Sequence, residues 1–144
     1  MPRLSVRLVS DGVGDGEFPR LQLPVRLTNP LTGKKLTVNA LVDTGAQVCV
    51  VDWHIAAALG HLHAHPDVKE APVHAVGATT QAKIHTFDIE LRDPKQPDRI
   101  LFRAPNLKVQ CLKSPFPCIL GVRGFLEHFD IRIRYPQRTA TLKW

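Results

Sequence analysis

One short stretch of the chain directs the prediction of its fold: Ala40-Leu41-Val42-Asp43-Thr44-Gly45-Ala46. The apolar run Val38–Val42 leads into Asp43, and a second apolar run, Val48–Val51, follows almost at once. A carboxylate between two strand-like apolar runs is costly to bury unless its charge is satisfied. Proteins often place ionisable groups in such positions because the perturbed chemistry is useful. Asp43 is therefore the first candidate for a catalytic group.

Size and composition indicate one soluble domain covering residues 1–144. The chain is 44% hydrophobic and 22% charged, which is ordinary for a globular protein of 144 residues. Twelve prolines and nine glycines favour a turn-rich β architecture. No apolar run approaches the ~20 residues that span a bilayer, and the N-terminus lacks the apolar region of a signal peptide. We therefore expect a cytoplasmic protein with no membrane partner, unless the chain is a piece of a longer one.

The formal net charge of +6 raises the question of an acidic partner. Lysines and arginines are scattered in ones and twos, as at Lys34-Lys35 and Arg132/Arg134. No basic stripe interleaved with aromatic residues appears, so base stacking has little support. Solvated surface charge, with no nucleic-acid partner, is the prediction.

The cysteines and histidines bear on disulfide bonds and on metal binding, respectively. Cys49, Cys111 and Cys118 are odd in number and lack framework spacing, which favours reduced, buried thiols. His61, His63 and His65 alternate, so on a strand they would share a face that a metal can use. No Cys, Asp or Glu at ligand spacing completes that set. We predict exposed loop or strand histidines, no metal and no cofactor.

Hydrophobic alternation predicts a nearly all-β chain with two short helices. Strands Leu21–Leu27 and Leu36–Val42 flank a turn at Asn29–Gly33, and the second strand leads into Asp43. Asp52 is expected to cap a helix, Trp53–Leu59, that Gly60 ends. Further strands are expected at Leu4–Val9, Val73–Val76, Thr79–Ile89, Arg99–Phe102, Asn106–Leu112, Phe116–Gly121, Phe129–Tyr135 and Thr139–Leu142. Ser10–Gly16 is expected to be a loop, Gly77-Ala78 a turn, and Gly124–His128 one or two helical turns.

These motifs carry a family resemblance. Residues Ala40–Ala46 resemble the active-site signature of aspartic proteases of the single-lobed retropepsin type. Ile119-Leu120-Gly121 resembles that family's second signature, an apolar-apolar-Gly strand beside the catalytic loop. Val76-Gly77 resembles the flap tip, and Phe125–Phe129 with the terminal hairpin resembles the closing elements of bacterial and DNA-damage-inducible-type members. The resemblance covers about Leu21 to Leu142.

The resemblance implies an all-β, single-lobed acid-protease fold: a closed β-barrel with one or two short helices and a flap hairpin. It implies an aspartic endopeptidase in which two carboxylates share a proton, one activating water and one protonating the substrate. Asp43 is the one Asp in this Thr-Gly context, so the mechanism requires a homodimer that places Asp43 against Asp43 of a second copy.

The resemblance also assigns roles around Asp43. Thr44 would lock the two loops together, Gly45 would permit close approach, and Ala46 would leave room beside the dyad. A flap made of Val76, Gly77 and Ala78 would cover an extended polypeptide substrate. Ile119, Leu120 and Gly121 would support the loop.

Two departures from the family pattern and one alternative function are part of the prediction. Val122 intervenes before Arg123-Gly124, where relatives often carry Arg directly after the glycine, so an ion pair between subunits from this arginine is in doubt. The flap has a single glycine, Gly77. The alternative function is a non-catalytic domain of the same fold that dimerises or binds peptides.

Overall fold

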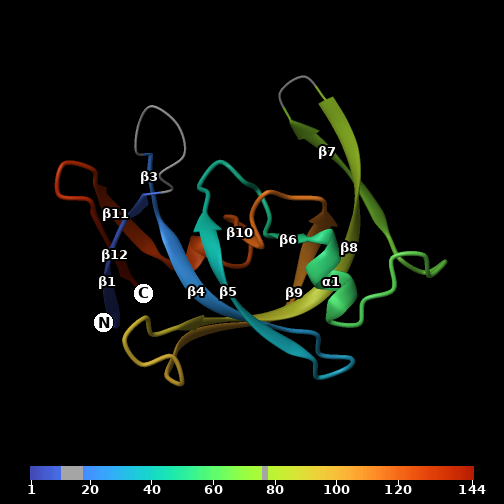
Figure 1. The fold of residues 1–144 in the computed structure, drawn as a ribbon, viewed down its shortest axis with the longest axis horizontal. Coiled ribbons are helices and arrows are strands. Elements are labelled where there is room, and N and C mark those ends of the chain that lie inside the picture. Colours follow the sequence, from blue (N-terminus) through green and yellow to red (C-terminus); the bar gives the residue numbers. More distant parts are fainter. Residues whose placement is uncertain (11–17, 76–77) are drawn as a thin grey trace.

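The computed structural model describes residues 1–10, 18–75 and 78–144, and these residues form an almost entirely β structure (Figure 1). The strands are β1 (Arg3–Arg7), β2 (Val9–Ser10), β3 (Pro19–Arg20), β4 (Gln22–Thr28), β5 (Lys35–Val42), β6 (Val50–Asp52), β7 (Glu70–Ala75), β8 (Ala78–Arg92), β9 (Ile100–Leu112), β10 (Cys118–Leu120), β11 (Asp130–Arg134) and β12 (Thr139–Lys143). Within those ranges the helices are α1 (Trp53–Ala58) and the 3-10 helix η1 (Leu126–His128). The predicted all-β class with two short helices is confirmed.

The main sheet closes on itself. Its seven strands run in the order β4-β5-β10-β6-β9-β8-β7, and β8 also pairs with β4. The pairings from β4 round to β8 therefore form a ring, while β7 is added outside it along β8. A closed ring leaves no unpaired edges among its members.

A separate sheet joins the two ends of the chain. Its order is β1-β12-β11, all antiparallel, and it lies beside β4 at the left of Figure 1. The short pair β2–β3 forms a third sheet. We call the β1-β12-β11 sheet the terminal sheet.

One apolar core fills the ring and continues under the terminal sheet. Alternate residues of β4, namely Leu23, Val25 and Leu27, are fully buried, as expected for strands with one face inside. The inward residues of the terminal sheet join the same core: Leu4, Val6, Ile131, Ile133, Ala140 and Leu142. Burial of this apolar area is the main force that holds the two sheets together.

The predicted turn and helix caps are confirmed. Gly33 ends the β4–β5 turn with φ +73°, and Gly60 follows α1 with φ +93°, conformations that glycine adopts without strain. The Asp52 carboxylate accepts a hydrogen bond from the backbone N–H of His54 and so caps α1. Buried Asn29 links the β4–β5 turn to the end of α1, because its Nδ2 donates a hydrogen bond to the Leu59 carbonyl at 2.9 Å.

Three boundaries predicted from the sequence are wrong. The break expected between Phe102 and Asn106 is absent, because β9 passes through this segment as a single strand. Asn106 takes φ +53° there, and the β8–β9 register shifts between Phe87 and Ile89, so the irregularity is a bulge. Ser10 belongs to β2, and Ala78 begins β8 opposite Ala75 instead of lying in a turn.

The three cysteines are free and buried, as predicted. Burial raises the pKa of Cys49 to about 11 and that of Cys111 to about 12, and it raises the pKa of Cys118 well above its usual range. These thiols therefore stay protonated and act as small apolar core residues. Among the described residues no helix has the length and apolar character needed to cross a membrane.

Candidate active site

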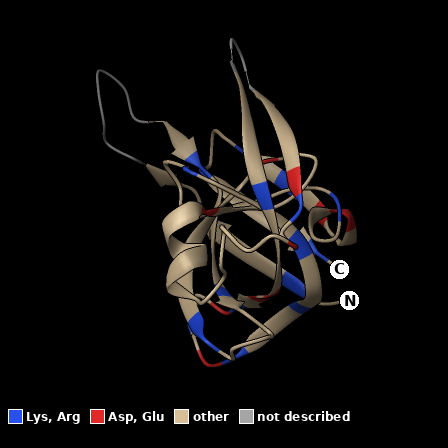
Figure 2. Ribbon diagram, turned by 90° about the vertical axis from the view of Figure 1, so that its right-hand side faces the viewer, with Lys and Arg blue, Asp and Glu red and all other residues tan. Residues whose placement is uncertain are grey.

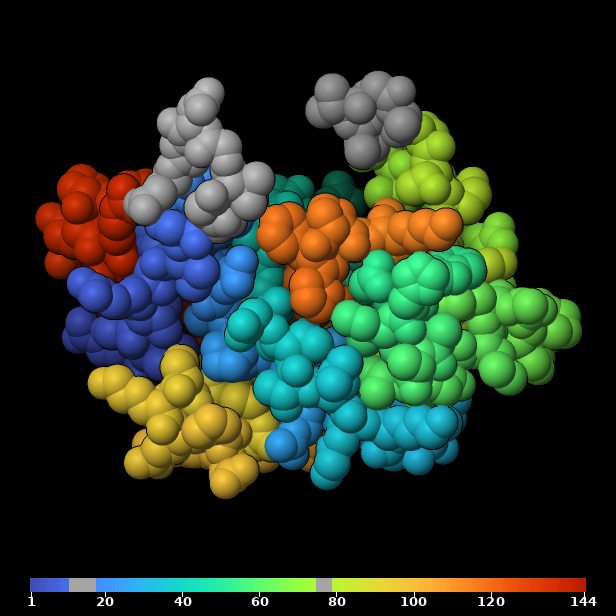
Figure 3. All heavy atoms as spheres, viewed as in Figure 1, coloured from blue at the N-terminus to red at the C-terminus, as the bar shows by residue number. Residues whose placement is uncertain are grey.

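Asp43 follows directly after β5, at the mouth of the barrel. Its backbone N–H donates to the Leu120 carbonyl at 3.1 Å, and the preceding Val42 N–H donates to the Leu21 carbonyl at 2.9 Å. These two bonds fix the strand end from both sides, so the chain leaves the barrel at a defined point. Figure 3 shows the face of the molecule around this region, with the orange segment before β10 exposed between β4 (blue) and α1 (green).

Strand β10 threads between the two strands that flank the Asp43 loop. It runs parallel to β5, with Leu120 opposite Val42, and antiparallel to β6, with Ile119 opposite Val50. The sequence-predicted segment Ile119-Leu120-Gly121 therefore lies directly beside the loop.

Backbone hydrogen bonds join the loop to the segment after β10. The Val122 N–H donates to the Ala46 carbonyl at 2.9 Å, and the Arg123 N–H donates to the Gln47 carbonyl at 2.8 Å. The Gly121 N–H donates to the Cys49 sulfur at 3.3 Å. With its polar backbone groups satisfied in this way, the loop is held in one conformation.

Gly121 is required by close packing of backbone on backbone. A Cβ at this position would lie 2.3 Å from the Val48 carbonyl oxygen and 3.0 Å from the Ala46 carbonyl oxygen. No side chain fits there, so the apolar-apolar-Gly pattern reflects two chain segments crossing in contact.

The side chain of Asp43 is half-buried and turned into its own loop. One carboxylate oxygen, Oδ1, accepts a hydrogen bond from the Gly45 N–H at 2.9 Å, and a Cβ on Gly45 would lie 3.2 Å from that oxygen. Thr44 and Gly45 are exposed, and Ala46 is half-buried. The loop thus presents a carboxylate, a hydroxyl and a backbone segment without a side chain at the surface of the chain.

Next to the loop lies an open hollow of about 340 Å³. Its lining residues come from the loop and from the segment after β10: Thr44, Gly45, Ala46, Gln47, Val122, Arg123 and Glu127. Glycine is required at position 124, since its φ is +84° and a Cβ would lie 2.2 Å from Leu107 Cδ1. Arg123 and Glu127 were not among the predicted site residues.

The hairpin β7–β8 extends beyond the barrel on the side where β5 ends (Figure 1). Its strands pair from Glu70 opposite Lys83 up to Ala75 opposite Ala78. Of the predicted flap residues, Val76 and Gly77 lie outside the described residues, and Ala78 begins β8. The structure therefore places the predicted flap hairpin on the same side as Asp43.

His61, His63 and His85 form a cluster where the β7–β8 hairpin joins the barrel. The prediction that His61 and His63 are exposed is therefore wrong, since His61 is buried and His63 is half-buried. His61 is 6% exposed and His85, on β8, is 7% exposed. Their rings stack with centroids 4.4 Å apart, and His63 stacks on Trp53 at 3.7 Å. His65 does remain exposed.

The carbonyl acceptors around the cluster fix the neutral tautomers. His61 Nε2 donates to the Thr86 carbonyl and His63 Nε2 donates to the Trp53 carbonyl, each at 2.9 Å. His63 Nδ1 is then an acceptor, and His85 Nε2 donates to it at 3.0 Å. Burial lowers the pKa of His85 to about 4 and also lowers the pKa of His61. Within the described part of the chain, no group of three or more His, Cys, Asp or Glu is placed to hold a metal ion.

Comparison with known proteins supports the fold. No family model matches the chain, and no curated protein matches its sequence. Among solved structures, the chain is similar to the crystal structure of a retropepsin-like aspartic protease from Rickettsia conorii. The TM-score is 0.61 over 97% of this chain and 90% of that one, at 16% sequence identity. At this identity the likeness shows the fold alone: the chain has a retropepsin-like all-β fold.

Proposed function

We propose that this chain is an aspartic endopeptidase that hydrolyses peptide bonds of polypeptides as a homodimer. The observation that carries the proposal is the Asp43 loop: β10 holds its backbone in one conformation, and a half-buried carboxylate lies at the barrel mouth next to exposed Thr44 and Gly45. The retropepsin-like fold adds support, because the family resemblance places the catalytic carboxylate in the loop that here follows β5.

Peptide hydrolysis by carboxylates needs two of them. One ionised carboxylate takes a proton from a bound water, which attacks the substrate carbonyl, while the protonated partner donates to the carbonyl oxygen. Two such groups a few ångströms apart cannot both ionise, so they titrate as a pair. A single Asp43 supplies one half of this chemistry.

Other aspartates near the barrel have structural partners. Asp52 accepts from the backbone N–H groups of His54 and Ser114. Asp88 pairs with Arg103 and accepts from the Asn106 N–H. Our proposal takes Asp43 of a second copy, brought in by a two-fold axis, as the second carboxylate.

The other residues have roles that follow from this arrangement. Thr44 would donate its hydroxyl proton to the neighbouring loop across the axis, and Gly45 and Ala46 would leave space for the substrate backbone. The β7–β8 hairpin would close over an extended polypeptide and exclude water. The hollow beside Thr44, lined also by Arg123 and Glu127, would meet the second copy.

The test is cleavage of an unfolded polypeptide from acidic to neutral pH, with products sequenced to locate the cut bonds. Wild-type protein is expected to cut it, and Asp43→Asn is expected to be inactive at every pH. Asp98→Asn is the matched control, since it makes the same change at an exposed position in the turn before β9 and should retain full activity. If wild-type protein binds the polypeptide without cutting it, the chain is a non-catalytic binding module of this fold.

A further inference from the structure

The outward face of the terminal sheet gathers basic residues that are scattered in the sequence. Because side chains alternate along a strand, the apolar residues point into the core and the polar ones point out. The outward cationic residues are Arg3 and Arg7 on β1, Arg132 and Arg134 on β11, and Lys143 on β12, and all are exposed. Figure 2 shows blue segments, Lys and Arg, close to the two chain ends.

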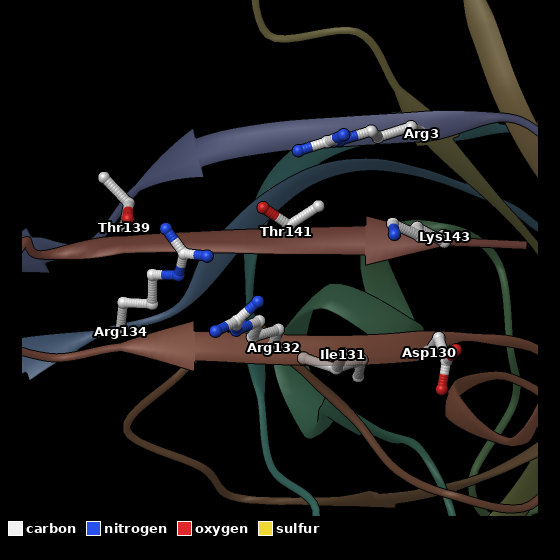
Figure 4. Close-up of a pocket in the computed structure, with 8 residues that line it drawn as sticks. All are labelled: Arg3, Asp130, Ile131, Arg132, Arg134, Thr139, Thr141 and Lys143. Atoms are coloured by element: carbon white, nitrogen blue, oxygen red, sulfur yellow. The ribbon is translucent and has the colours of Figure 1, made fainter.

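The register of the three strands builds a trough. Arg3 of β1 lies opposite Lys143 of β12, which lies opposite Asp130 of β11. Further along β12, Thr141 and Thr139 lie opposite Arg132 and Arg134 of β11. The middle strand thus supplies a floor of short hydroxyl side chains, while arginines on the outer strands form the walls. The resulting hollow has a volume of about 290 Å³ and is lined by Arg3, Asp130, Ile131, Arg132, Arg134, Thr139, Thr141 and Lys143 (Figure 4).

Little on the protein offsets this charge. Asp130 is the acidic residue that lines the trough. None of the five cations takes part in an ion pair found among the described residues. Figure 4 shows Arg132 and Arg134 reaching from β11 toward β12, with the Arg134 guanidinium group over β12. Like charges held this close favour an anionic occupant that relieves their repulsion.

We propose that this trough binds an acidic segment of a polypeptide, extended along β12. Adjacent strands are about 4.8 Å apart, so the outer strands β1 and β11 are separated by about 10 Å, which is the width for one extended chain. Residues two apart on an extended chain are about 6.7 Å apart, so acidic residues at alternate positions match the repeat of Arg132 and Arg134. Arginine binds carboxylates through paired hydrogen bonds, and the Thr139 and Thr141 hydroxyls can bond the peptide backbone.

Other occupants fit less well. Single-stranded nucleic acid needs aromatic side chains on which bases stack, and none lines the trough. A second copy of the chain carries a net charge of +6 and the same basic face, so two such faces repel each other. The acidic polypeptide is the occupant that the charge and dimensions favour.

Binding is measured with a fluorescent peptide of alternating Glu and Ser, titrated with the Asp43→Asn protein so that no cleavage intervenes. We expect saturable binding that weakens as salt is raised, and no binding of the matched Gln-Ser peptide. Arg132→Glu with Arg134→Glu should weaken binding by about tenfold or more. Lys34→Glu with Lys35→Glu makes the same change in net charge at an exposed turn and should leave affinity within about twofold.

If the charge reversal impairs folding, the milder double variant Arg132→Gln with Arg134→Gln replaces it. This variant should also weaken peptide binding. The proposal is overturned if the Glu-Ser peptide does not bind. It is overturned equally if Lys34→Glu with Lys35→Glu weakens peptide binding as much as Arg132→Glu with Arg134→Glu does. It is also overturned if an oligothymidylate binds the trough more tightly than the peptide, or if the arginines prove instead to mediate self-association in sedimentation. Since the assay needs no catalysis, its failure leaves the proposed endopeptidase activity standing.

Discussion

The Asp43 loop and the histidine cluster both place ionisable side chains among apolar strands, but they do so in opposite ways. In the cluster, ring nitrogens of His61, His63 and His85 bond to carbonyl groups or to one another. In the loop, Asp43 has one bond to its own backbone, and Thr44 is exposed.

This difference separates structural polar groups from groups held for a further partner. A buried polar group that is hydrogen-bonded to other groups of the same chain stabilises one packing of the fold. A carboxylate and a hydroxyl held on a rigid loop without a complete set of partners are arranged for something that arrives from outside. This contrast supports our proposal that the cluster stabilises the fold and that the Asp43 loop carries the chemistry, and four experiments test it.

Asp43→Asn should give the largest effect, a loss of kcat/KM of about 10³-fold or more, because the amide cannot share a proton with its partner. The asparagine Oδ1 still accepts from the Gly45 N–H, so the melting temperature should change little. Peptidase assays and thermal unfolding on the same sample measure both quantities. A large fall in melting temperature would mean that Asp43 is a structural group.

Gly121→Ala should lower the free energy of unfolding by about 3 kcal/mol or more, because its Cβ would lie 2.3 Å from the Val48 carbonyl oxygen. Gly33→Ala is the matched control, because its Cβ would meet no atom within 4 Å. It should lower the free energy of unfolding by only about 1 kcal/mol, the cost of placing alanine at φ +73°. Urea unfolding of both variants measures the difference. Equal losses would contradict the close crossing of the loop and the segment after β10.

The histidine cluster should make the fold sensitive to acid. The pKa of His85 falls from 6.5 in the unfolded chain to about 4 in the folded protein, through burial and through His61, His63 and Lys83. The unfolded state therefore binds more protons between these values, and stability is lost as pH falls from 6.5 to 4, by about 2–3 kcal/mol. Urea unfolding across this range should show the loss, and His85→Gln should reduce it. An unchanged pH profile in that variant would exclude His85 as the cause.

Thr44→Val should have the smallest effect, an increase of about tenfold in the dimer dissociation constant, since one hydroxyl hydrogen bond per loop is lost. Thr44 is exposed in the protomer, so the free energy of unfolding of the monomer should not change. Sedimentation over a range of concentrations measures the constant. Unchanged dimerisation would remove Thr44 from the interface.

Local signals in the sequence predicted most of the barrel. The Asn29–Gly33 turn, the Asp52 cap and Gly60 each act on neighbouring residues, so the β4–β5 hairpin and α1 were placed within a residue or two. Between Phe102 and Asn106 the prediction of two separate strands failed. Asn106 adopts a positive φ and its N–H donates to Asp88 Oδ1, so the strand continues.

Features built from distant residues were not predictable. His63 and His85 meet only because β8 returns past the loop after α1, and nothing near either histidine in sequence marks the other. The basic trough likewise needs the first strand of the chain beside the last two. The catalytic candidate was found because its motif is local: Asp43-Thr44-Gly45 is contiguous, and Gly121 follows an apolar pair. A second copy of the chain cannot be read from one sequence directly. The one indication of it is that the sequence carries a single Asp-Thr-Gly motif where the proposed chemistry needs two carboxylates.

The most direct test of the half-site is to mix subunits. Wild-type protein is equilibrated with a fourfold excess of Asp43→Asn under conditions where dimers exchange, and peptidase activity is measured against the same wild-type concentration alone. If the site forms between two copies, random pairing leaves about one-fifth of the wild-type chains with a wild-type partner, so activity should fall to about one-fifth. Activity that stays at the level of wild-type protein alone would contradict the claim that Asp43 is half of a shared site.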